Sequence, residues 1–222
     1  MGQWIELKPE GAGPIAAWRA DPDGKPRAGI VVIQEIFGVN SHVRAVADRF
    51  ASVGYLGIAP AVFDHVEKGF DVGYDPDSRG CGMSIVGKLD FEQTLRDVAA
   101  AIEVAKEAGK VGIVGYCFGG SVVWAAAARL SGLDAAVGYY GGRILATKDL
   151  KPQVPTELHF GEKDQHIPIK EVRAFAAEHP EVAVFTYPAE HGFNCDQRES
   201  YEAGSAALAS SRTLEFFRRH LG

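Results

Sequence analysis

The stretch Val111-Gly-Ile-Val-Gly-Tyr-Cys-Phe-Gly-Gly120 indicates the fold more clearly than any other part of the sequence. Its first four residues read as a strand buried on both faces, and the small residues of 120–130 predict a helix after it. Gly115 and Gly119 flank Cys117 in the pattern glycine-x-nucleophile-x-glycine, which forms a sharp turn between strand and helix. Cysteine stands where serine is usual. We therefore expect Cys117 to be a nucleophile at a helix N-terminus, which favours a thiolate; a small buried cysteine in a glycine-rich turn is the alternative.

The rest of the chain alternates apolar strand patterns with helix patterns. Residues 4–7 and 14–18 predict an antiparallel hairpin around a glycine-rich turn. Residues 61–88 predict a long irregular loop, a feature that is usually functional. We expect one domain over residues 1–222, with a mostly parallel α/β sheet, the hairpin at its edge and helices on both faces in three layers. The predicted strands are 29–34, 55–59, 111–114, 135–140, 156–160 and 182–187; the predicted helices are 41–53, 90–108, 120–130, 168–178 and 201–220.

Composition excludes several classes of protein. The 222 residues carry 23 Lys and Arg against 29 Asp and Glu, a net charge of −6, which disfavours a nucleic-acid-binding protein. No run of apolar residues is long enough to span a membrane, and the first residues lack the features of a signal peptide. Three cysteines, an odd number, argue against a disulfide framework and for a reducing compartment. We expect a cytoplasmic protein that is a monomer or a homodimer.

A histidine and an acidic residue follow Cys117 in the order that a catalytic triad of this architecture requires. Asp164 comes just after the strand 156–160, and His191 comes just after the strand 182–187. Loops at the carboxyl ends of parallel strands meet at one edge of the sheet, where such folds bind ligands. We expect a Cys117–His191–Asp164 triad. Glu162 and His166 are the nearest alternatives for its acid and base.

Glu35 directly follows the apolar strand 29–34, where a carboxylate is costly unless it faces a polar cleft. The loop after this strand supplies one of the backbone N–H groups of an oxyanion hole in folds of this kind. We therefore expect the Glu35 loop to lie beside Cys117, with Glu35 either accepting the thiol proton or pairing with an arginine. A solvent-facing glutamate at the strand end is the alternative.

At these positions the sequence resembles the dienelactone hydrolase family of α/β-hydrolases. The matching segments span residues 34–193 and are Gln34-Glu-Ile-Phe-Gly38, Pro60, Gly115-Tyr-Cys-Phe-Gly-Gly120, Tyr139-Tyr-Gly141, His159-Phe-Gly-Glu-Lys-Asp164 and His191-Gly-Phe193. The resemblance implies an α/β-hydrolase fold and a cofactor-independent opening of small lactones. It also implies that Glu35 accepts the Cys117 proton, that the N–H groups of Ile36 and Phe118 form the oxyanion hole, and that Tyr140 lines the pocket.

The chain departs from the family at the residues that hold the substrate carboxylate. Well-studied members use two arginines, one in the long loop after the fourth strand and one four residues after the histidine. Here Cys195 occupies the second place. Arg79 in the loop 61–88 and Arg198 are the candidates for this charge, because arginine is the natural bidentate partner of a carboxylate. Within the motifs, Phe37 and Phe193 are the expected apolar contacts with substrate.

Two other interpretations of the function stay open on the sequence alone. A thioesterase or general carboxylesterase would use the same triad, and a non-catalytic α/β-hydrolase-fold protein would only bind a ligand. Cys81 and Cys195 are expected in loops facing the cleft, as incidental thiols rather than as a redox pair or disulfide. We expect no metal, because no histidine pair stands at zinc-ligand spacing with cysteine among His65, His159, His166, His179 and His191.

Overall fold

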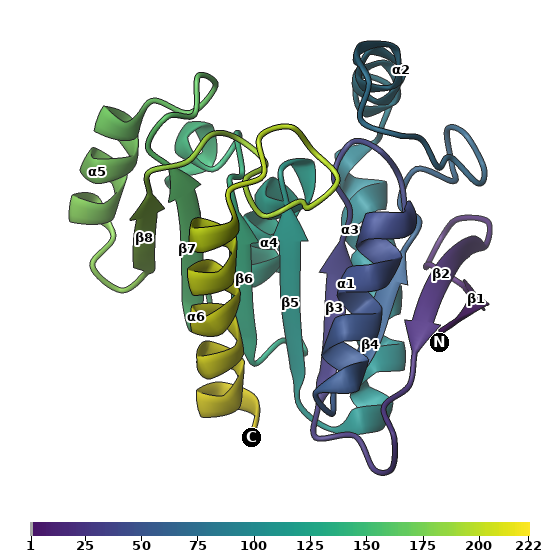
Figure 1. Ribbon diagram of the computed structural model, residues 1–222. Helices are drawn as coiled ribbons and strands as arrows, with labels where there is room; N and C mark the ends of the chain where they lie inside the picture. The colour runs from purple at the N-terminus through teal and green to yellow at the C-terminus, as the bar shows by residue number, and fades with distance from the viewer. Residues whose placement is uncertain (1) are drawn as a thin grey trace.

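The computed structural model describes residues 2–222 and contains an eight-stranded sheet in the order β1-β2-β4-β3-β5-β6-β7-β8 (Figure 1). The hairpin β1–β2 is antiparallel and β2 also runs antiparallel to β4, whereas all the remaining neighbours are parallel. The predicted architecture is thus confirmed. The strands are β1 (Gln3–Leu7), β2 (Ile15–Ala20), β3 (Gly29–Ile33), β4 (Leu56–Pro60), β5 (Val111–Tyr116), β6 (Ala135–Tyr139), β7 (Thr156–Gly161) and β8 (Ala183–Tyr187).

Helices cover both faces of the sheet and make three layers. Helices α1 and α6 lie in front of the sheet in Figure 1, and α3 and α4 lie behind it. The central strands β3 and β5 are fully buried, because both of their faces are covered. The helices are α1 (Ser41–Ser52), α2 (Pro76–Val86), α3 (Phe91–Ala105), α4 (Phe118–Arg129), α5 (Ile169–Glu178) and α6 (Ala203–Leu221), with short 3₁₀ turns η1 (Lys106–Ala108) and η2 (Leu145–Thr147).

The prediction of an irregular segment over residues 61–88 was wrong for its second half, which contains α2. Asp75 caps this helix by accepting a hydrogen bond from the backbone N–H of Ser78 at 2.9 Å, and Pro76 stands at its first turn. Both are ordinary signals of a helix start. Two glycines within α2, Gly80 and Gly82, weaken the helix pattern. Close packing explains Gly82, because a Cβ there would lie 2.0 Å from the Ile36 carbonyl oxygen; at Gly80 no atom lies within 4 Å of an added Cβ.

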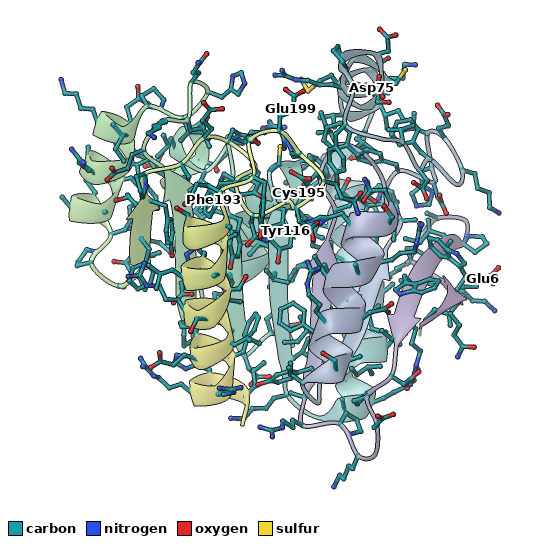
Figure 2. All side chains as sticks on the ribbon, in the orientation of Figure 1. Glu6, Asp75, Tyr116, Phe193, Cys195 and Glu199 are labelled. Atoms are coloured by element: carbon teal, nitrogen blue, oxygen red, sulfur yellow. The ribbon has the colours of Figure 1, made fainter. Side chains whose placement is uncertain are left out.

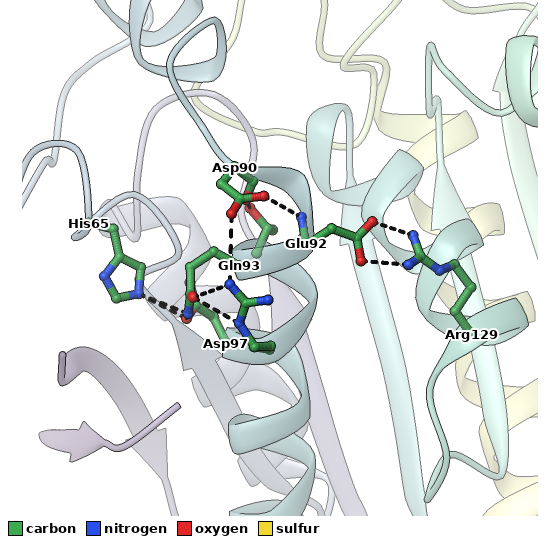
Figure 3. A network of polar contacts seen from close by, with 8 residues as sticks. His65, Asp90, Glu92, Gln93, Asp97 and Arg129 are labelled. Atoms are coloured by element: carbon green, nitrogen blue, oxygen red, sulfur yellow. Dashed lines mark hydrogen bonds and ion pairs between the residues drawn. The ribbon is translucent and has the colours of Figure 1, made fainter. Parts of the chain in front are cut away.

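A polar network fixes the segment after β4 to α3 (Figure 3). His65 Nε2 lies 3.0 Å from Oδ1 of Asp97, which also accepts a hydrogen bond from Gln93 at 2.9 Å. Arg96 in turn donates to the Gln93 side-chain oxygen. Asp97 is fully buried, and burial raises its pKa against the opposing effect of these partners. The network helps to fix the chain that leads to α2.

The ends of the helices differ slightly from the sequence-based limits. Asn40 rather than Ser41 caps α1, since its side-chain oxygen accepts the N–H of Val43 at 3.2 Å. Gly54 follows the end of α1 with φ of +97°, as expected for a helix terminator. Within residues 2–222, no helix has the length and apolar character needed to cross a membrane.

Candidate active site

Cys117 occupies the sharp turn between β5 and α4, with φ of 55° and ψ of −113°, a conformation that non-glycine residues rarely adopt. The flanking glycines are required by space. A Cβ at Gly115 would lie 2.3 Å from the Gly119 carbonyl oxygen, and one at Gly119 would lie 2.5 Å from that of Ile33. The Cys117 N–H donates to the Tyr139 carbonyl at 3.0 Å. The fold thus holds the thiol in one place at the start of α4.

Asp164 and His191 come together from two neighbouring loops. His191 Nδ1 lies 2.7 Å from Oδ2 of Asp164, although 27 positions separate the two residues. The other oxygen, Oδ1, accepts the backbone N–H groups of His166 at 2.8 Å and Ile167 at 3.2 Å. Each of these contacts restrains the carboxylate, so Asp164 orients the imidazole and fixes Nε2 as the ring nitrogen left for another partner.

Electrostatics in this pair favour the imidazolium form of His191. Burial by itself lowers the pKa of His191, but hydrogen bonds with Asp164 and Cys117 and their negative charges raise it to about 10. Burial raises the pKa of Asp164, whereas its hydrogen bonds with His191 and the backbone outweigh this and hold it below the ordinary value. The arrangement therefore favours a positively charged His191 held by the negatively charged Asp164.

Glu162 and His166, the alternatives for the acid and the base, have other partners. Glu162 accepts a hydrogen bond from the Thr186 hydroxyl at 2.9 Å and pairs with Arg173 at 3.4 Å. His166 lies edge-on to His191, with ring centroids 5.7 Å apart, and its Nε2 is 3.2 Å from Arg79. Of the acidic candidates, only Asp164 is within hydrogen-bond distance of His191.

Glu35 is buried, with 1% of its surface exposed. It pairs with an arginine, which is one of the two roles predicted for it from the sequence. Its Oε1 accepts a hydrogen bond from Arg198 at 2.9 Å. Burial lowers the pKa of Arg198, but the charges of Glu35, Tyr140 and Cys117 more than compensate, and the net shift is upward. The solvent-facing alternative for Glu35 was wrong. Arg198 therefore neutralises the buried Glu35 carboxylate and also lines the cleft.

The loop after β3 approaches the start of α4, as expected for an oxyanion hole. The carbonyl groups of Ile33 and Gln34 at the end of β3 lie next to Gly119 in the first turn of α4. Phe118 is the first residue of α4, where a backbone N–H has no acceptor within the helix. Ile36, two residues after Gln34, is packed beneath α2 through the contact of its carbonyl with Gly82.

A cleft of about 1290 Å³ opens above these residues. It lies between α2, the loop after β7 and the segment after β8; Asp75 and Glu199 mark two of its sides in Figure 2. His191 and His166 line this cleft, and its positively charged side chains are Arg79, Lys163 and Arg198. Phe37 also lines the cleft, and the guanidinium carbon of Arg198 lies over its ring, 5.8 Å from the ring centroid.

Two of the expected substrate contacts lie deeper than the sequence indicated. Phe193 is completely buried and packs against Tyr140 and Tyr187, with ring centroids at 5.5 and 5.1 Å, so we remove it from the contact set. Tyr140 is also completely buried, with φ of 39°, and its ring lies 5.0 Å from that of His191. Tyr140 therefore supports the imidazole from behind rather than lining the open cleft.

The two remaining cysteines differ from the expected loop thiols. Cys81 lies on α2 and is exposed, whereas Cys195 lies in the segment after β8, as expected, but is completely buried (Figure 2). Cys195, His42 and Asp196 form a group whose ligand-type atoms lie within 4.8 Å of one another. Burial raises the pKa of Cys195 to about 12, and its sulfur is already in contact with the Tyr74 hydroxyl and the Gln197 N–H. Because the thiol already has these polar partners, we assign no metal to the group.

The sequence did not single out His42 or Asp196. His42 Nδ1 lies 3.0 Å from Oδ1 of Asp196, although the two residues are 154 positions apart. The only available signal was a histidine in the first turn of a helix that begins near Glu35. No spacing rule predicts a partner at such a separation.

Known proteins are similar to this chain over nearly its whole length. The sequence model of the dienelactone hydrolase family matches residues 15–221. A provisionally named carboxymethylenebutenolidase of Synechocystis is 35% identical, over 93% of this chain and 92% of that protein. The carboxymethylenebutenolidase of Pseudomonas putida is 34% identical, over 88% and 87%. A crystal structure of a provisionally assigned dienelactone hydrolase from Klebsiella pneumoniae has a TM-score of 0.83 at 29% identity and covers 99% of this chain and 100% of that one.

Proposed function

Because the chain belongs to the dienelactone hydrolase family, we propose that it hydrolyses a small lactone or ester through a covalent acyl-enzyme formed on Cys117. The observation that carries the proposal is the 2.7 Å contact between Asp164 and His191, combined with the effect of Cys117 on the pKa of His191. These three residues come from three loops at one edge of the sheet, as nucleophile, base and orienting acid require.

The proposed reaction proceeds in two steps without a metal or organic cofactor. The Cys117 thiolate attacks the carbonyl carbon, and the backbone N–H groups of Phe118 and Ile36 receive the developing oxyanion. The C–O bond then breaks, and the His191 imidazolium gives its proton to the leaving oxygen. In the second step neutral His191 removes a proton from water, which attacks the acyl group and releases the thiolate.

Glu35 has a proposed role before the attack. In the resting protein its carboxylate pairs with Arg198, and it accepts the Cys117 proton when substrate binds. Once Glu35 is neutral, Arg198 is free to pair with a carboxylate on the substrate. Arg79 and Lys163 add two more positive charges to the walls of the cleft, which also favours an anionic substrate. A lactone that carries a carboxylate, such as the relatives' name carboxymethylenebutenolidase denotes, fits this proposal.

A second candidate is a thioesterase or general carboxylesterase with the same nucleophile. The cleft of about 1290 Å³ supports it, because a volume larger than ordinary ligand pockets accommodates a longer acyl or leaving group. A substrate panel distinguishes the two candidates. It contains lactones with and without a carboxylate, p-nitrophenyl acetate and an acyl thioester. The lactone proposal expects the largest kcat/KM for the carboxylate-bearing lactone; a preference for the thioester selects the second candidate.

The variant Cys117→Ala tests the proposal against a protein that only binds its ligand. We expect turnover of every substrate in the panel to be lost, because no other thiol described in the cleft has a base beside it. Full retention of turnover would overturn the mechanism. A wild-type protein that binds the lactone but turns over none of the panel would favour the non-catalytic alternative.

A further inference from the structure

A second cavity lies between α1 and α6, on the face of the sheet that these two helices cover (Figure 1). Its volume is about 240 Å³, and among residues 2–222 it shares no lining side chain with the catalytic cleft. Its floor is formed by the carboxyl ends of β5 and β6, where Figure 2 shows Tyr116 between the two helices. The buried side chains that line it are Val46, Phe50, Tyr116, Tyr139, Asn194 and Thr213.

The inner part of this cavity is apolar and aromatic. The Tyr116 and Tyr139 rings on its floor have centroids 4.8 Å apart. The Phe50 ring packs against Phe217, with centroids 5.9 Å apart. These contacts hold the three lining rings in place. An apolar cavity of about 150 Å³ is large enough to bind benzene. A cavity of about 240 Å³ therefore has room for one aromatic ring with a small substituent.

The opening of the cavity carries a positive charge. Arg49 is the only charged side chain among the described residues that line it, and it is half exposed, so it lies where the cavity meets solvent. Its guanidinium is 3.9 Å from Oδ2 of Asp196, which is equally exposed. An ion pair this long and this exposed contributes little. Arg49 can therefore leave Asp196 and pair with the carboxylate of a bound molecule.

The floor of the cavity adds a hydrogen-bond donor. The hydroxyl groups of Tyr139 and Thr213 lie 2.6 Å apart and form a hydrogen bond with each other. The Tyr116 hydroxyl, by contrast, makes no hydrogen bond with residues 2–222. Burial raises the pKa of Tyr116 against the lowering effect of the Arg49 charge, so this hydroxyl keeps its proton and remains a donor. An apolar pocket with a cation and a free donor is complementary to an aromatic ring that bears an acidic group.

We propose that the cavity between α1 and α6 binds a small aromatic carboxylate of the benzoate class. The ring lies against Phe50 and Tyr116, and the carboxylate pairs with the Arg49 guanidinium at the opening. The site adjoins the turn that holds the nucleophile, because Tyr116 precedes Cys117 and the Tyr139 carbonyl accepts the Cys117 N–H at 3.0 Å. The inference goes beyond the proposed function and does not depend on it, since binding at this site requires no turnover.

The test is an NMR titration of the ¹⁵N-labelled protein with benzoate, acetate and benzyl alcohol. We expect saturable shifts of amide signals from α1 and α6, and a Kd for benzoate about tenfold or more below that for acetate, which has no ring to bury. Arg49→Gln should raise the Kd of benzoate about tenfold and leave that of benzyl alcohol within about twofold of wild type, because only benzoate is charged. Arg219→Gln is the matched control, since Arg219 lies on α6 outside the cavity and pairs with Glu215. It should bind benzoate like the wild type.

A filled cavity provides a second test. Val46→Phe places a ring in the inner part of the cavity and should abolish binding of both benzoate and benzyl alcohol. If Val46→Phe does not fold, Leu214→Trp replaces it from the α6 side, with the same expected loss. Absence of saturable benzoate binding to the wild type, or an equal Kd for Arg49→Gln and Arg219→Gln, would overturn the inference.

Further variants separate this site from the catalytic cleft and from the proposed function. Benzoate binding that is lost in Arg79→Gln but kept in Arg49→Gln would place the anion in the cleft and overturn the inference. Cys117→Ala should bind benzoate like the wild type, whatever its activity. Full turnover in Cys117→Ala with weakened benzoate binding in Arg49→Gln rejects the proposed function and leaves this inference intact.

Discussion

Arg198 and Glu35 form an ion pair at 2.9 Å that joins the end of β3 to the segment after His191 across 163 positions of sequence. The carboxylate is buried and the guanidinium is largely so, with 1% and 19% of their side chains exposed. Arg198 lines the cleft, so the pair links the buried carboxylate to the wall of the cleft. The pair holds Arg198 in place. Arg198 lies three positions after Cys195, where the resemblance to the family predicts an arginine.

Replacing Arg198 by Met should destabilise the protein by about 3–5 kcal/mol, because it leaves the Glu35 carboxylate buried without its counter-charge. The double variant Arg198→Met with Glu35→Gln should recover most of that stability, since no charge remains unpaired. Urea denaturation of the two single variants and the double variant measures the coupling. Equal stability of Arg198→Met and wild type would contradict the buried ion pair. Activity should stay low in the double variant.

The variant Asp164→Asn should lower kcat by about 10³-fold or more, because the amide no longer fixes the His191 tautomer or stabilises its positive charge. Glu162→Gln is the matched control, since Glu162 contacts Thr186 and Arg173 instead. Steady-state kinetics on one substrate compares them. A larger loss in Glu162→Gln than in Asp164→Asn would reverse the assignment.

The pair of Asp164 and His191 should also contribute to stability over a defined range of pH. The pKa of His191 is raised from 6.5 to about 10, so this contribution is complete below about pH 6.5 and is lost as the pH rises towards 10. The pKa of Asp164 is lowered, so its part is lost as the pH falls through the acidic range. The Tm difference between wild type and His191→Asn should therefore shrink above about pH 10. A difference independent of pH would argue against a charged His191.

Iodoacetamide should alkylate Cys117 faster in the otherwise wild-type protein than in His191→Asn, because a positive charge on His191 favours the thiolate that reacts. The experiment uses Cys81→Ser as the background, since Cys81 is exposed, whereas Cys195 is buried and its pKa is raised to about 12. In the same background, the rate of alkylation of His191→Asn at neutral pH should be lower, because this variant lacks the positive charge. Equal rates in the two proteins would contradict an effect of His191 on Cys117.

The glycine after the turn gives a steric prediction that is independent of the mechanism. Gly119→Ala should destabilise the fold by about 1–3 kcal/mol, because its Cβ would lie 2.5 Å from the carbonyl oxygen of Ile33. Gly142→Ala, where nothing lies within 4 Å of the added atom, should change stability by less than about 0.5 kcal/mol. Thermal denaturation compares the two. Similar melting temperatures would show that the turn is less tightly packed than described.

Arg79 offers a prediction about substrate charge. Arg79→Gln should raise KM for a carboxylate-bearing lactone about tenfold and leave kcat/KM for p-nitrophenyl acetate near the wild-type value, because only the first substrate carries a charge. The position of Arg79 on α2, 3.2 Å from His166, places its charge on the wall of the cleft. An equal effect on both substrates would show that Arg79 acts on the site rather than on the substrate.

Local signals were sufficient for the turn that carries Cys117. Gly115, Gly119 and the apolar strand before them are neighbours in sequence; the steric need for Gly115 arises within the turn, whereas that for Gly119 comes from the carbonyl groups of Ile33 and Gln34. The alternation of strand and helix patterns likewise predicted the sheet and its layers. Helix α2 was missed, although Asp75 and Pro76 are helix-start signals, because its glycines lower the helix propensity of the segment and the contact of Gly82 with the Ile36 loop is visible only in the fold.

By itself the sequence determined the order of elements and named Glu35, Cys117, Asp164 and His191 as candidate site residues. Only the tertiary structure decided their partners. It selected Asp164 over Glu162, directed Arg198 to Glu35, buried Phe193, and joined His42 to Asp196. The physical reason is that turns and helix starts depend on neighbouring residues, whereas buried charges and acceptors are satisfied by groups that the fold brings from more than 150 positions away.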